Sequence, residues 1–462
     1  MHDADHNDQA LDAAVIVVGA GYAGLSTALK LHESGVDVLV LEAGDRVGGR
    51  TLSSDENGIR IDHGGQWAGP TQHHFLALAE RFGCTTFPTY EDGRSTEIWR
   101  DGSRVEYVGA GPESGPGVDE YERITALLDD LARTIDPAAP WLAEHFAAWD
   151  NQSAADFFAD QTDDLDARAR LALTIHGLWC AEPEEISILH VLLYIQGAGG
   201  YTQLMETRGC AQDRRFHDGA DGAARAVAAL LGDRVLLSAP VHTIRSDAHH
   251  ASVTTARGEL RCRRVVVTAP PPSARAIEFV PALSSEKRAW LEGNEMGRVA
   301  KVHVLYPSAF WRDHDNSGIA TLYTPETVGV VFDNSPADAH CGALVAFVYA
   351  DRLDAWAKLD DASRREAVLA DLVAVMGDQA RDCVGYVEKN WAADEVIGGG
   401  YEAYPRPGTW SLAGTSGWRA PTGLVHWAGT ETADVWNGYI DGAISSGARA
   451  ADEVIASLAR HD

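Results

Sequence analysis

Residues 14–50 read AVIVVGAGYAGLSTALKLHESGVDVLVLEAGDRVGGR, and they predict a strand, a glycine-rich turn, a helix and a second strand in direct succession. The four apolar residues at 15–18 are typical of a buried parallel strand. The following helix has its apolar residues at helical spacing. The second strand, at 36–41, ends in Glu42. This order is the unit from which α/β sheets are built.

The turn between strand and helix, GAGYAG at 19–24, has the chemistry of a phosphate site. Gly19 permits the tight turn, Gly21 lets the backbone approach a pyrophosphate, and Gly24 lets helix and strand pack closely. The diphosphate can then bind N–H groups at the positive end of the helix. Glu42 lies 18 residues beyond Gly24, where a carboxylate binds the ribose hydroxyls of adenosine. Together these features predict a dinucleotide site.

The segment after the second strand, GDRVGGRT at 44–51, contains another glycine pair and Arg50. An NAD site has no need of them. An arginine fork beside flexible backbone can bind the far side of a pyrophosphate. In this segment the sequence resembles the FAD-binding amine oxidases, and the resemblance implies that the dinucleotide is FAD.

Composition excludes other classes of function. The 462 residues carry a net charge of −30, which argues against nucleic acid or an anionic membrane as a partner, because both attract positive surfaces. The six cysteines are scattered without a CxxC pair, so we expect free thiols in a cytoplasmic protein. The dispersed histidines predict no metal site. The polar first residues and the lack of a long apolar run predict neither a signal peptide nor a membrane anchor.

A third motif, HGGQWAGPTQ at 63–72, follows the βαβ unit. In the monoamine oxidase family a very similar glycine pair follows the GGRT element, and its backbone touches the flavin. The chain therefore resembles that family, from about residue 14 to residue 458. His63 has no nucleophile or acid beside it to form a triad, so we expect it to be a packing or surface histidine.

Lys301 interrupts the otherwise apolar strand GRVAKVHV at 297–304. A buried ammonium is costly unless it has partners, whereas an exposed edge strand would accommodate a lysine without any function. The resemblance implies the first alternative, because the equivalent lysine of the family holds a water against flavin N5.

The C-terminal part contains GGGYEAYP at 398–405, HWAGTET at 426–432 and WNGYIDGA at 436–443. A final helix is expected from about Gly438, with its N-terminus directed at an anionic centre. In a flavoprotein this centre is N1/C2=O of the flavin. The N–H group of Ile440 is the donor we expect to face it.

Tyr401 and Tyr439 match the two aromatic residues that flank the route to the flavin in this family. Electron-rich ring faces orient an amine nitrogen and favour the charge that develops on it as hydride leaves. Without the resemblance they would be ordinary core or surface residues. The resemblance implies catalytic roles for Tyr401, Tyr439 and Lys301. Human-type monoamine oxidases bind FAD through a cysteine just before the first tyrosine, but this chain has Gly400 there, so we expect non-covalent FAD.

The resemblance also implies the remaining contacts. The expected FAD contacts are Gly19, Gly21, Ala23, Gly24, Glu42, Ala43, Gly49, Arg50, Gly65, Gln66, Trp67, Val241, Gly429, Thr430, Glu431, Tyr439 and Ile440. The expected substrate contacts are Gln212, Trp179 and Met205. Core filling explains Trp179 and Met205 equally well, and a simple sheet strand would explain Val241.

The expected fold is α/β, with a Rossmann-like FAD-binding domain of the glutathione-reductase type and an inserted α+β substrate domain. The FAD-binding domain is expected in three parts, 12–87, 217–291 and 395–462. The substrate domain is expected at 88–216 and 292–394. Within 88–216 the alternation of strands and helices is lost, which indicates helices and loops.

The implied reaction is oxidation of an amine to an imine, which water converts to an aldehyde or ketone while O2 becomes H2O2. A hydrophobic, aromatic or alicyclic monoamine is favoured, because no carboxylate for the second ammonium of a polyamine is assigned, although Glu182 and Glu206 are candidates. The expected partners are therefore a small amine and O2. The sequence is also compatible with a homodimer.

Two alternatives remain. An L-amino acid oxidase needs an arginine clamp for the carboxylate, and the candidates are Arg208, Arg214 and Arg215. A flavin-binding protein without enzymatic activity would have no reason to keep Lys301 together with both tyrosines.

Overall fold

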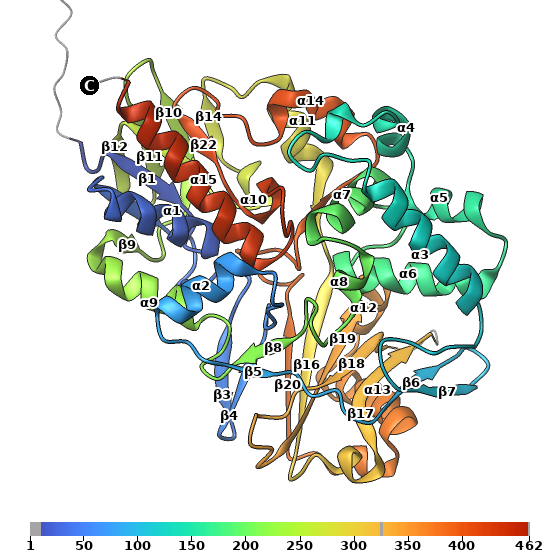
Figure 1. Cartoon of the computed structure of the whole chain (residues 1–462). Coiled ribbons are helices and arrows are strands. Elements are labelled where there is room, and N and C mark those ends of the chain that lie inside the picture. Colours follow the sequence, from blue (N-terminus) through green and yellow to red (C-terminus); the bar gives the residue numbers. More distant parts are fainter. Residues whose placement is uncertain (1–10, 324–326, 461–462) are drawn as a thin grey trace, which may run out of the picture.

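The structure is a computed structural model that describes residues 11–323 and 327–460. Figure 1 shows three regions: a sheet with α1 and α15 at upper left, a group of helices at upper right, and a second large sheet below. The chain passes between these regions several times, so each contains segments that are far apart in sequence.

The first sheet is parallel throughout and has the strand order β22-β13-β1-β2-β9. Its strands are β22 (Val425–Trp427), β13 (Arg264–Val267), β1 (Val15–Val18), β2 (Val38–Leu41) and β9 (Val235–Leu236). All residues of β1 and β2 are buried, as a parallel sheet covered on both faces requires. The βαβ unit expected from the sequence is therefore present.

Helices cover this sheet and converge on its carboxyl edge. They are α1 (Tyr22–Glu33), α2 (His73–Arg81), α9 (Gly222–Leu231) and α15 (Ile440–Leu458). A Cβ atom at position 24 would lie 1.9 Å from the carbonyl oxygen of Gly19, so only glycine allows α1 to start this close to β1. Likewise, a Cβ atom at Gly447 of α15 would lie 2.2 Å from the carbonyl oxygen of Ala23.

A smaller sheet beside the first has the order β12-β11-β10-β14. Its strands are β10 (Val241–Ser246), β11 (Ala251–Thr255), β12 (Gly258–Cys262) and β14 (Glu278–Val280). The prolines that follow β13 begin the short helix α10 (Pro271–Ala274), because proline lacks the N–H group that a continuing strand would need.

The second large sheet has seven strands in the order β20-β16-β19-β18-β17-β6-β7. They are β20 (Gly385–Asn390), β16 (Val299–Tyr306), β19 (Gly342–Tyr349), β18 (Val330–Asp333), β17 (Asn316–Leu322), β6 (Arg94–Ile98) and β7 (Arg104–Tyr107). All eight residues of β16 and of β19 are buried, and Lys301 pairs with Phe347. The buried lysine therefore lies on an interior strand, paired on both sides, and not at the edge of the sheet.

Strands β6 and β7 come from the part of the chain, 88–216, that we expected to contain only helices and loops. Strand β6 reads RSTEI, which lacks an apolar alternation, yet four of its five residues are buried. Its Glu97 is buried because Arg170 on a distant helix neutralises it. Hydrophobic periodicity cannot detect a strand of this kind.

The other elements pack around these sheets. The helices at upper right in Figure 1 are α3 (Val118–Ala132), α4 (Phe146–Asn151), α5 (Ala154–Gln161), α6 (Leu165–Trp179), α7 (Ile188–Ala198), α8 (Tyr201–Met205), α11 (Ser285–Gly293) and α14 (Thr409–Gly417). Helices α12 (Ala350–Trp356) and α13 (Asp361–Met376) pack on the seven-stranded sheet. Short strand pairs are β3 (Ser53–Glu56) with β4 (Ile59–Asp62), β5 (Thr86–Pro88) with β8 (Arg214–Phe216), and β15 (Asn294–Met296) with β21 (Ala403–Pro405).

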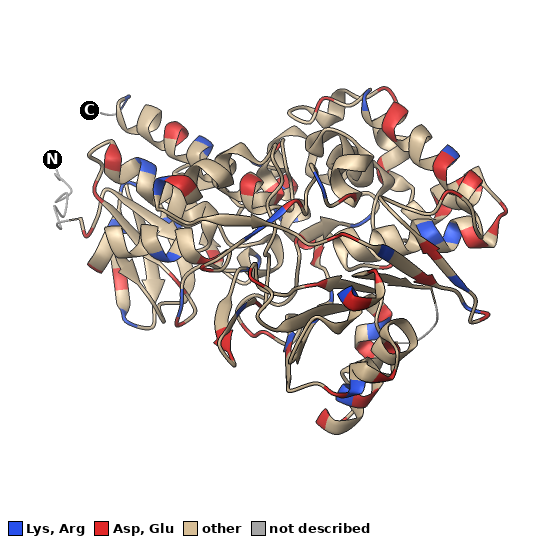
Figure 2. Cartoon of the chain, turned by 60° about the horizontal axis from the view of Figure 1, so that its bottom comes forward, with Lys and Arg blue, Asp and Glu red and all other residues tan. Residues whose placement is uncertain are grey.

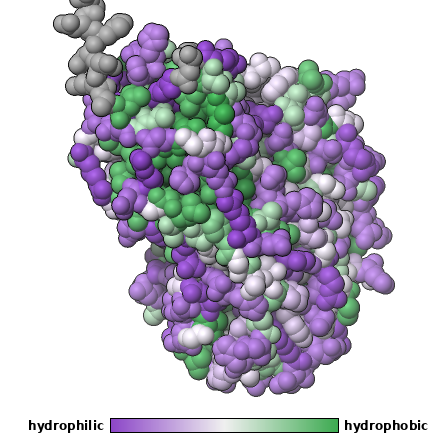
Figure 3. Space-filling view, turned by 60° about the vertical axis from the view of Figure 1, so that its left-hand side comes forward, coloured by the Kyte–Doolittle hydropathy of each residue, from purple (hydrophilic) through white to green (hydrophobic). Residues whose placement is uncertain are grey.

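Acidic residues are distributed over the helices and loops of the whole chain (Figure 2). The face seen in Figure 3 is mostly hydrophilic, with hydrophobic residues gathered in its upper part. Within the described ranges, no helix combines the length and the apolar character that crossing a membrane requires.

Candidate active site

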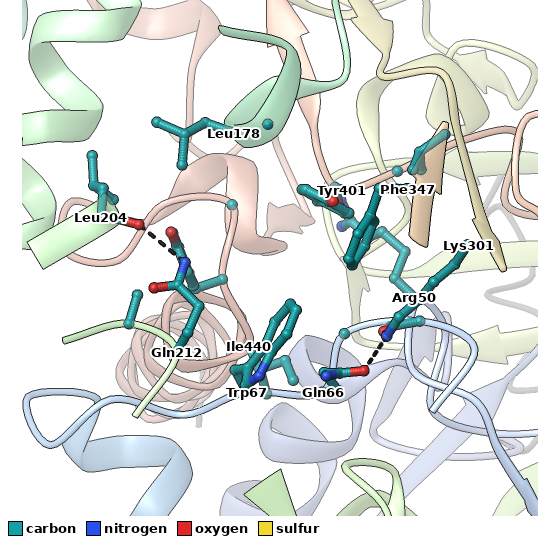
Figure 4. Close-up of a pocket in the computed structure, with 18 of the residues that line it drawn as sticks. Arg50, Gln66, Trp67, Leu178, Leu204, Gln212, Lys301, Phe347, Tyr401 and Ile440 are labelled. Carbon is teal, nitrogen blue, oxygen red and sulfur yellow. Dashed lines mark hydrogen bonds between the residues drawn. The ribbon is translucent and has the colours of Figure 1, made fainter. Parts of the chain in front are cut away.

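A cavity of about 720 Å³ lies where the regions meet. Its walls include the N-termini of α1 and α15, the segment around Gly49 and Arg50, helix α6, and strands of the seven-stranded sheet. Figure 4 shows Gln212 and Leu204 on one side of it, and Lys301 with Gln66 on the other. The cavity therefore joins the predicted dinucleotide site to the predicted substrate site.

The end of the cavity beside α1 has the shape that a pyrophosphate needs. No side chain caps the N-terminus of α1, and Gly19, Gly21 and Ala23 line the cavity there. A Cβ atom at Gly49 would lie 3.2 Å from the Cα of Gly21, so two bare backbone segments face each other. Helix N–H groups and bare backbone together form an anion site.

Glu42 and Arg50 supply charge of both signs to this end. The Glu42 carboxylate follows β2, lines the cavity and accepts N–H groups of Ala20 at 2.6 Å and Gly44 at 2.8 Å. Arg50 is held by Glu431 at 2.5 Å, and it also donates to the carbonyl oxygen of Tyr401. Burial opposes protonation of Arg50, but the Glu431 carboxylate outweighs it and raises the pKa of the guanidinium.

A second helix N-terminus faces the cavity at α15. Its N-cap residue, Tyr439, forms no capping side-chain hydrogen bond, and Ile440 lines the cavity. The helix begins two residues later than expected, because Gly438 has a φ of 81° and the chain turns there. The arrangement favours negative charge in front of Ile440.

Tyr401 and Tyr439 both line the cavity, although they are 38 positions apart in the chain. Tyr439 packs on Trp436 and Tyr194, with ring centroids 4.8 Å and 5.8 Å apart. Tyr401 meets Phe347 edge to face at 6.2 Å. Burial raises the pKa of both phenols, so both are neutral at ordinary pH.

Lys301 projects from β16 and is only 3% exposed. Its ammonium donates to the carbonyl oxygen of Gly64 at 2.7 Å and to Oε1 of Gln66. The rings of Trp67 and Phe347 lie 5.5 Å and 5.6 Å from Nζ. Burial lowers the pKa of the ammonium, and the nearby Asp62 carboxylate opposes that shift.

Comparison with known proteins identifies this arrangement. Residues 22–455 match the family of flavin containing amine oxidoreductases. The chain is similar to a putative flavin-containing monoamine oxidase, AofH, of Mycobacterium tuberculosis, with 39% identity over 446 residues, 96% of this chain and 97% of that protein. The chain belongs to the flavin-containing amine oxidase family. The family and the α/β fold expected from the sequence are thus confirmed.

Two solved structures agree with this assignment. Wild-type putrescine oxidase bound to putrescine matches with a TM-score of 0.92 at 32% identity, over 96% of this chain and 99% of that one. Cyclohexylamine oxidase from Brevibacterium oxydans matches with the same TM-score and identity, over 97% and 99% of the two chains. The family uses a flavin, and the anion site, Glu42 and the two helix N-termini of this amine oxidase fit one.

Not every expected flavin contact lines the cavity. Gly65, Gln66, Trp67, Ala43, Val241, Gly429 and Thr430 do so, as do the residues described above. Gly24 and Glu431 lie behind the wall: Gly24 lets α1 approach β1, and Glu431 holds Arg50. These two residues shape the site from behind.

The substrate end of the amine oxidase has one unpaired acceptor. Gln212 donates to the carbonyl oxygen of Leu204 at 3.0 Å, and its Oε1 is buried with no hydrogen-bond partner in the described structure. A buried acceptor without a partner is costly, so it suits a ligand that donates. Met205 also lines the cavity, at a partly exposed position.

Trp179 differs from the expectation. Its side chain is fully buried, does not line the cavity, and packs on Tyr194 with ring centroids 4.7 Å apart. It therefore supports Tyr194, which lines the cavity and packs against Tyr439. The wall is formed instead by Leu173, Gly177 and Leu178 on one face of α6. Their helical spacing was the signal that could have identified them.

A buried ion pair at the substrate end was not anticipated. Arg170 and Glu97 are each 4% exposed and joined by two hydrogen bonds, of 2.7 Å and 2.8 Å. The guanidinium lies over the rings of Trp99 and Tyr323 at 4.8 Å and 5.3 Å. This pair therefore adds polar atoms to the wall but no unpaired charge of its own.

The three candidate arginines do not form a carboxylate clamp. Arg208 lines the cavity but pairs with Glu91 and Asp92. Arg214 pairs with Asp213, and Arg215 is buried, donating to the carbonyl oxygen of Ser335.

Of the two candidate carboxylates, only Glu206 lines the cavity. Glu182 lies outside it and bonds His176 at 2.8 Å. His63 is buried and bonds Ser54 at 2.7 Å, and it also lines the cavity beside Gly64.

Proposed function

We propose that this amine oxidase converts a hydrophobic monoamine to an imine with non-covalently bound FAD, and that O2 is the final electron acceptor. One observation carries the substrate class. Lys301 and the tyrosine pair share a cavity whose buried acidic group at the substrate end, Glu97, is already neutralised by Arg170. Among the described residues at this end, the second ammonium of a diamine would find no buried, unpaired carboxylate.

Each part of the site has a role in this proposal. The N-terminus of α1, Glu42 and Arg50 would hold the diphosphate and ribose, and the N-terminus of α15 would face the pyrimidine part of the flavin. Bound in this way, FAD would accept the hydride of the amine's α-carbon and pass the electrons to O2. Lys301 would provide an ammonium donor for the oxygen half of the reaction.

The substrate would be held by rings and by one amide. Tyr401 and Tyr439 would orient the nitrogen between their faces, where the charge that develops on it is favoured. Gln212 would accept an N–H group of the amine with its unpaired Oε1. Because the cavity wall is largely apolar, it disfavours the ammonium form of the substrate, so deprotonation needs no dedicated base.

The experiment is a peroxide assay with cyclohexylamine, benzylamine, putrescine and L-leucine. We expect the monoamines to exceed putrescine in kcat/KM by at least about tenfold, which corresponds to about 1.4 kcal/mol. If the enzyme instead prefers putrescine and Glu206→Gln removes that preference, Glu206 binds the second ammonium of the diamine. Faster turnover of leucine would support the amino acid oxidase alternative.

Non-covalent binding has its own test. Gly400 has no side chain, and in this position a thiol would be needed for a bond to the flavin. We expect acid precipitation of the yellow holoenzyme to leave the flavin in the supernatant. Colour that stays in the pellet after washing with denaturant would contradict the proposal.

We keep the cytoplasmic location and a homodimer as predictions. All six cysteines are free thiols, which supports a reducing compartment. Cell fractionation would test the location, and sedimentation of the purified holoenzyme would test the homodimer.

A further inference from the structure

Three buried side chains, those of Gln66, Asn334 and His303, connect Lys301 to the backbone of β4. Gln66 accepts from the Lys301 ammonium with Oε1 and donates with Nε2 to Oδ1 of Asn334 at 3.0 Å. Asn334 and Nδ1 of His303 are 3.2 Å apart, and Nε2 of His303 lies 3.0 Å from the carbonyl oxygen of Asp62. Lys301 is 3% exposed, Gln66 1%, and Asn334 and His303 0%. No water can therefore replace a lost link cheaply.

The end of this chain at the Asp62 carbonyl has a fixed hydrogen-bonding role. The Asp62 carbonyl can only accept, so His303 must carry its proton on Nε2 and offer Nδ1 as an acceptor. Asn334 then donates its NH2 group to Nδ1, which leaves its Oδ1 for Gln66. Because Asn334 Oδ1 accepts from the NH2 group of Gln66, Oε1 of Gln66 is left to accept from Lys301. Each amide thus has one permitted orientation.

The charges around the chain agree with this assignment. Burial lowers the pKa of His303, and the positive charge of Lys301 lowers it further, so the imidazole is neutral and has one acceptor nitrogen. Lys301 and His303 lie two positions apart on β16, and their side chains therefore leave the same face of the strand. The link between them runs through Gln66, whose side chain lies next to Lys301 in Figure 4.

We propose that Gln66, Asn334 and His303 form a directed hydrogen-bond relay, and that Asn334 and His303 act through Gln66 as positioning residues for the Lys301 ammonium. The proposal rests on the role of Lys301 in the oxygen half of the reaction. If the relay is broken, Gln66 can rotate its NH2 group toward the ammonium. Lys301 would then lose an acceptor and its defined position.

The decisive variant is Asn334→Leu, which has a similar shape but can neither donate nor accept. Its matched control is Asn294→Leu, because Asn294 is also 0% exposed and donates to a backbone carbonyl, that of Trp290, but does not belong to the relay. In stopped-flow measurements on the holoenzyme we expect Asn334→Leu to slow flavin reoxidation by O2 about tenfold, a common effect of small displacements. Reduction by the amine should stay within about twofold of the control variant.

A double-mutant cycle separates positioning from general damage. Lys301→Met should slow reoxidation, and adding Asn334→Leu to it should slow reoxidation no further, because the relay would then have nothing to position. If the slowing in the double variant equals the product of the slowing in the two single variants, the proposal is overturned. Equal behaviour of Asn334→Leu and Asn294→Leu would overturn it as well.

The state of His303 gives a readout that does not depend on turnover. In protein labelled with nitrogen-15 histidine, we expect His303 to show a protonated Nε2 and an unprotonated Nδ1, and Asn334→Leu to perturb Nδ1 while Asn294→Leu does not. A protonated Nδ1 in the wild-type protein would contradict the relay. The spectrum can be as expected while Lys301→Met leaves reoxidation unchanged. In that case the hydrogen bonds of the relay are confirmed, but its positioning role and the proposed role of Lys301 are wrong.

Discussion

Tyr439 combines two features that distinguish it from an ordinary core tyrosine. One side of the residue faces the cavity, Trp436 packs behind it, and Tyr194, which also lines the cavity, packs against it. Trp179 supports Tyr194 in turn, so the ring is held by a continuous group of buried aromatic residues. This packing fixes where the substrate nitrogen can meet the ring.

The first prediction is that Tyr439→Ala slows flavin reduction by the amine about tenfold or more. Loss of the ring removes a contact with developing positive charge of about 0.5–2 kcal/mol. It also loosens the substrate, and small displacements can cost roughly 10²-fold. Stopped-flow reduction of the holoenzyme measures the rate.

Tyr439→Phe is the matched control, because it keeps the ring and removes only the hydroxyl. It should cost much less than Tyr439→Ala, and flavin content should be unchanged in both variants. Equal impairment would show that the hydroxyl is the working group. Wild-type rates in both variants would remove Tyr439 from the reaction.

Among the secondary-structure elements, α1 and α15 matter most for the site. Both direct an uncapped N-terminus at the cavity, and they pack on each other through Gly447. A hydrogen bond from Oγ1 of Thr27 on α1 to the carbonyl oxygen of Gly447, 3.0 Å long, fixes their relative position. A substitution that pushes α1 away from β1 would therefore displace the N-termini of both α1 and α15, which are the two anion sites.

We therefore expect Gly24→Ala to reduce flavin content strongly and to lower stability by about 1–3 kcal/mol, the usual cost of overpacking. The added methyl group would lie 1.9 Å from the carbonyl oxygen of Gly19. Flavin absorbance relative to protein absorbance and urea unfolding measure the two effects.

Gly177→Ala is the control for stability. Gly177 lies within α6, and a Cβ atom there would meet nothing within 4 Å. The substitution should raise stability by about 0.5–1 kcal/mol through helix propensity. A Gly24→Ala protein with normal flavin content and stability would contradict the packing argument.

Beyond the active site, the protein buries a second lysine. Lys287 of α11 is 1% exposed, donates to the carbonyl oxygen of Trp418 at 2.9 Å, and lies 4.5 Å from the ring centre of Trp427. Burial, together with the charge of Arg449, lowers the pKa of Lys287 to about 7. In the unfolded chain a lysine titrates near pH 10.4.

This difference predicts how stability depends on pH. Between about pH 7 and pH 10 the unfolded state binds a proton at Lys287 that the folded state does not, so Lys287 makes stability rise with pH. The slope approaches about 1.4 kcal/mol per pH unit. Below pH 7 both states carry the proton, and the contribution of Lys287 becomes constant.

Lys287→Met should remove this part of the pH dependence. We compare the free energies of unfolding of the variant and the wild type. The value for the variant minus the value for the wild type should decrease as pH rises from 7 to 10. Urea unfolding at several pH values measures it, with Lys358→Met at an exposed position as the control for the methionine side chain. A difference that is independent of pH would mean that Lys287 is not neutral in the folded protein.

The sequence was sufficient for features that depend on neighbours in the chain. The apolar run at 15–18, the glycines at 19–24 and Glu42 act within one βαβ unit, so their spacing predicted the strand, the helix and the site between them. Lys301 also stood out locally, because a lysine in an apolar strand requires partners.

Features that join distant segments required the tertiary structure. Glu97 and Arg170 are 73 residues apart, and each looks like an ordinary surface charge until β6 and α6 bring them together. Trp179 and Leu178 are adjacent, and only the packing of α6 decided that Leu178 lines the cavity while Trp179 supports it from behind. The physical reason is that strand and helix patterns arise from local periodicity, whereas charge pairing and cavity lining depend on which faces of distant elements meet.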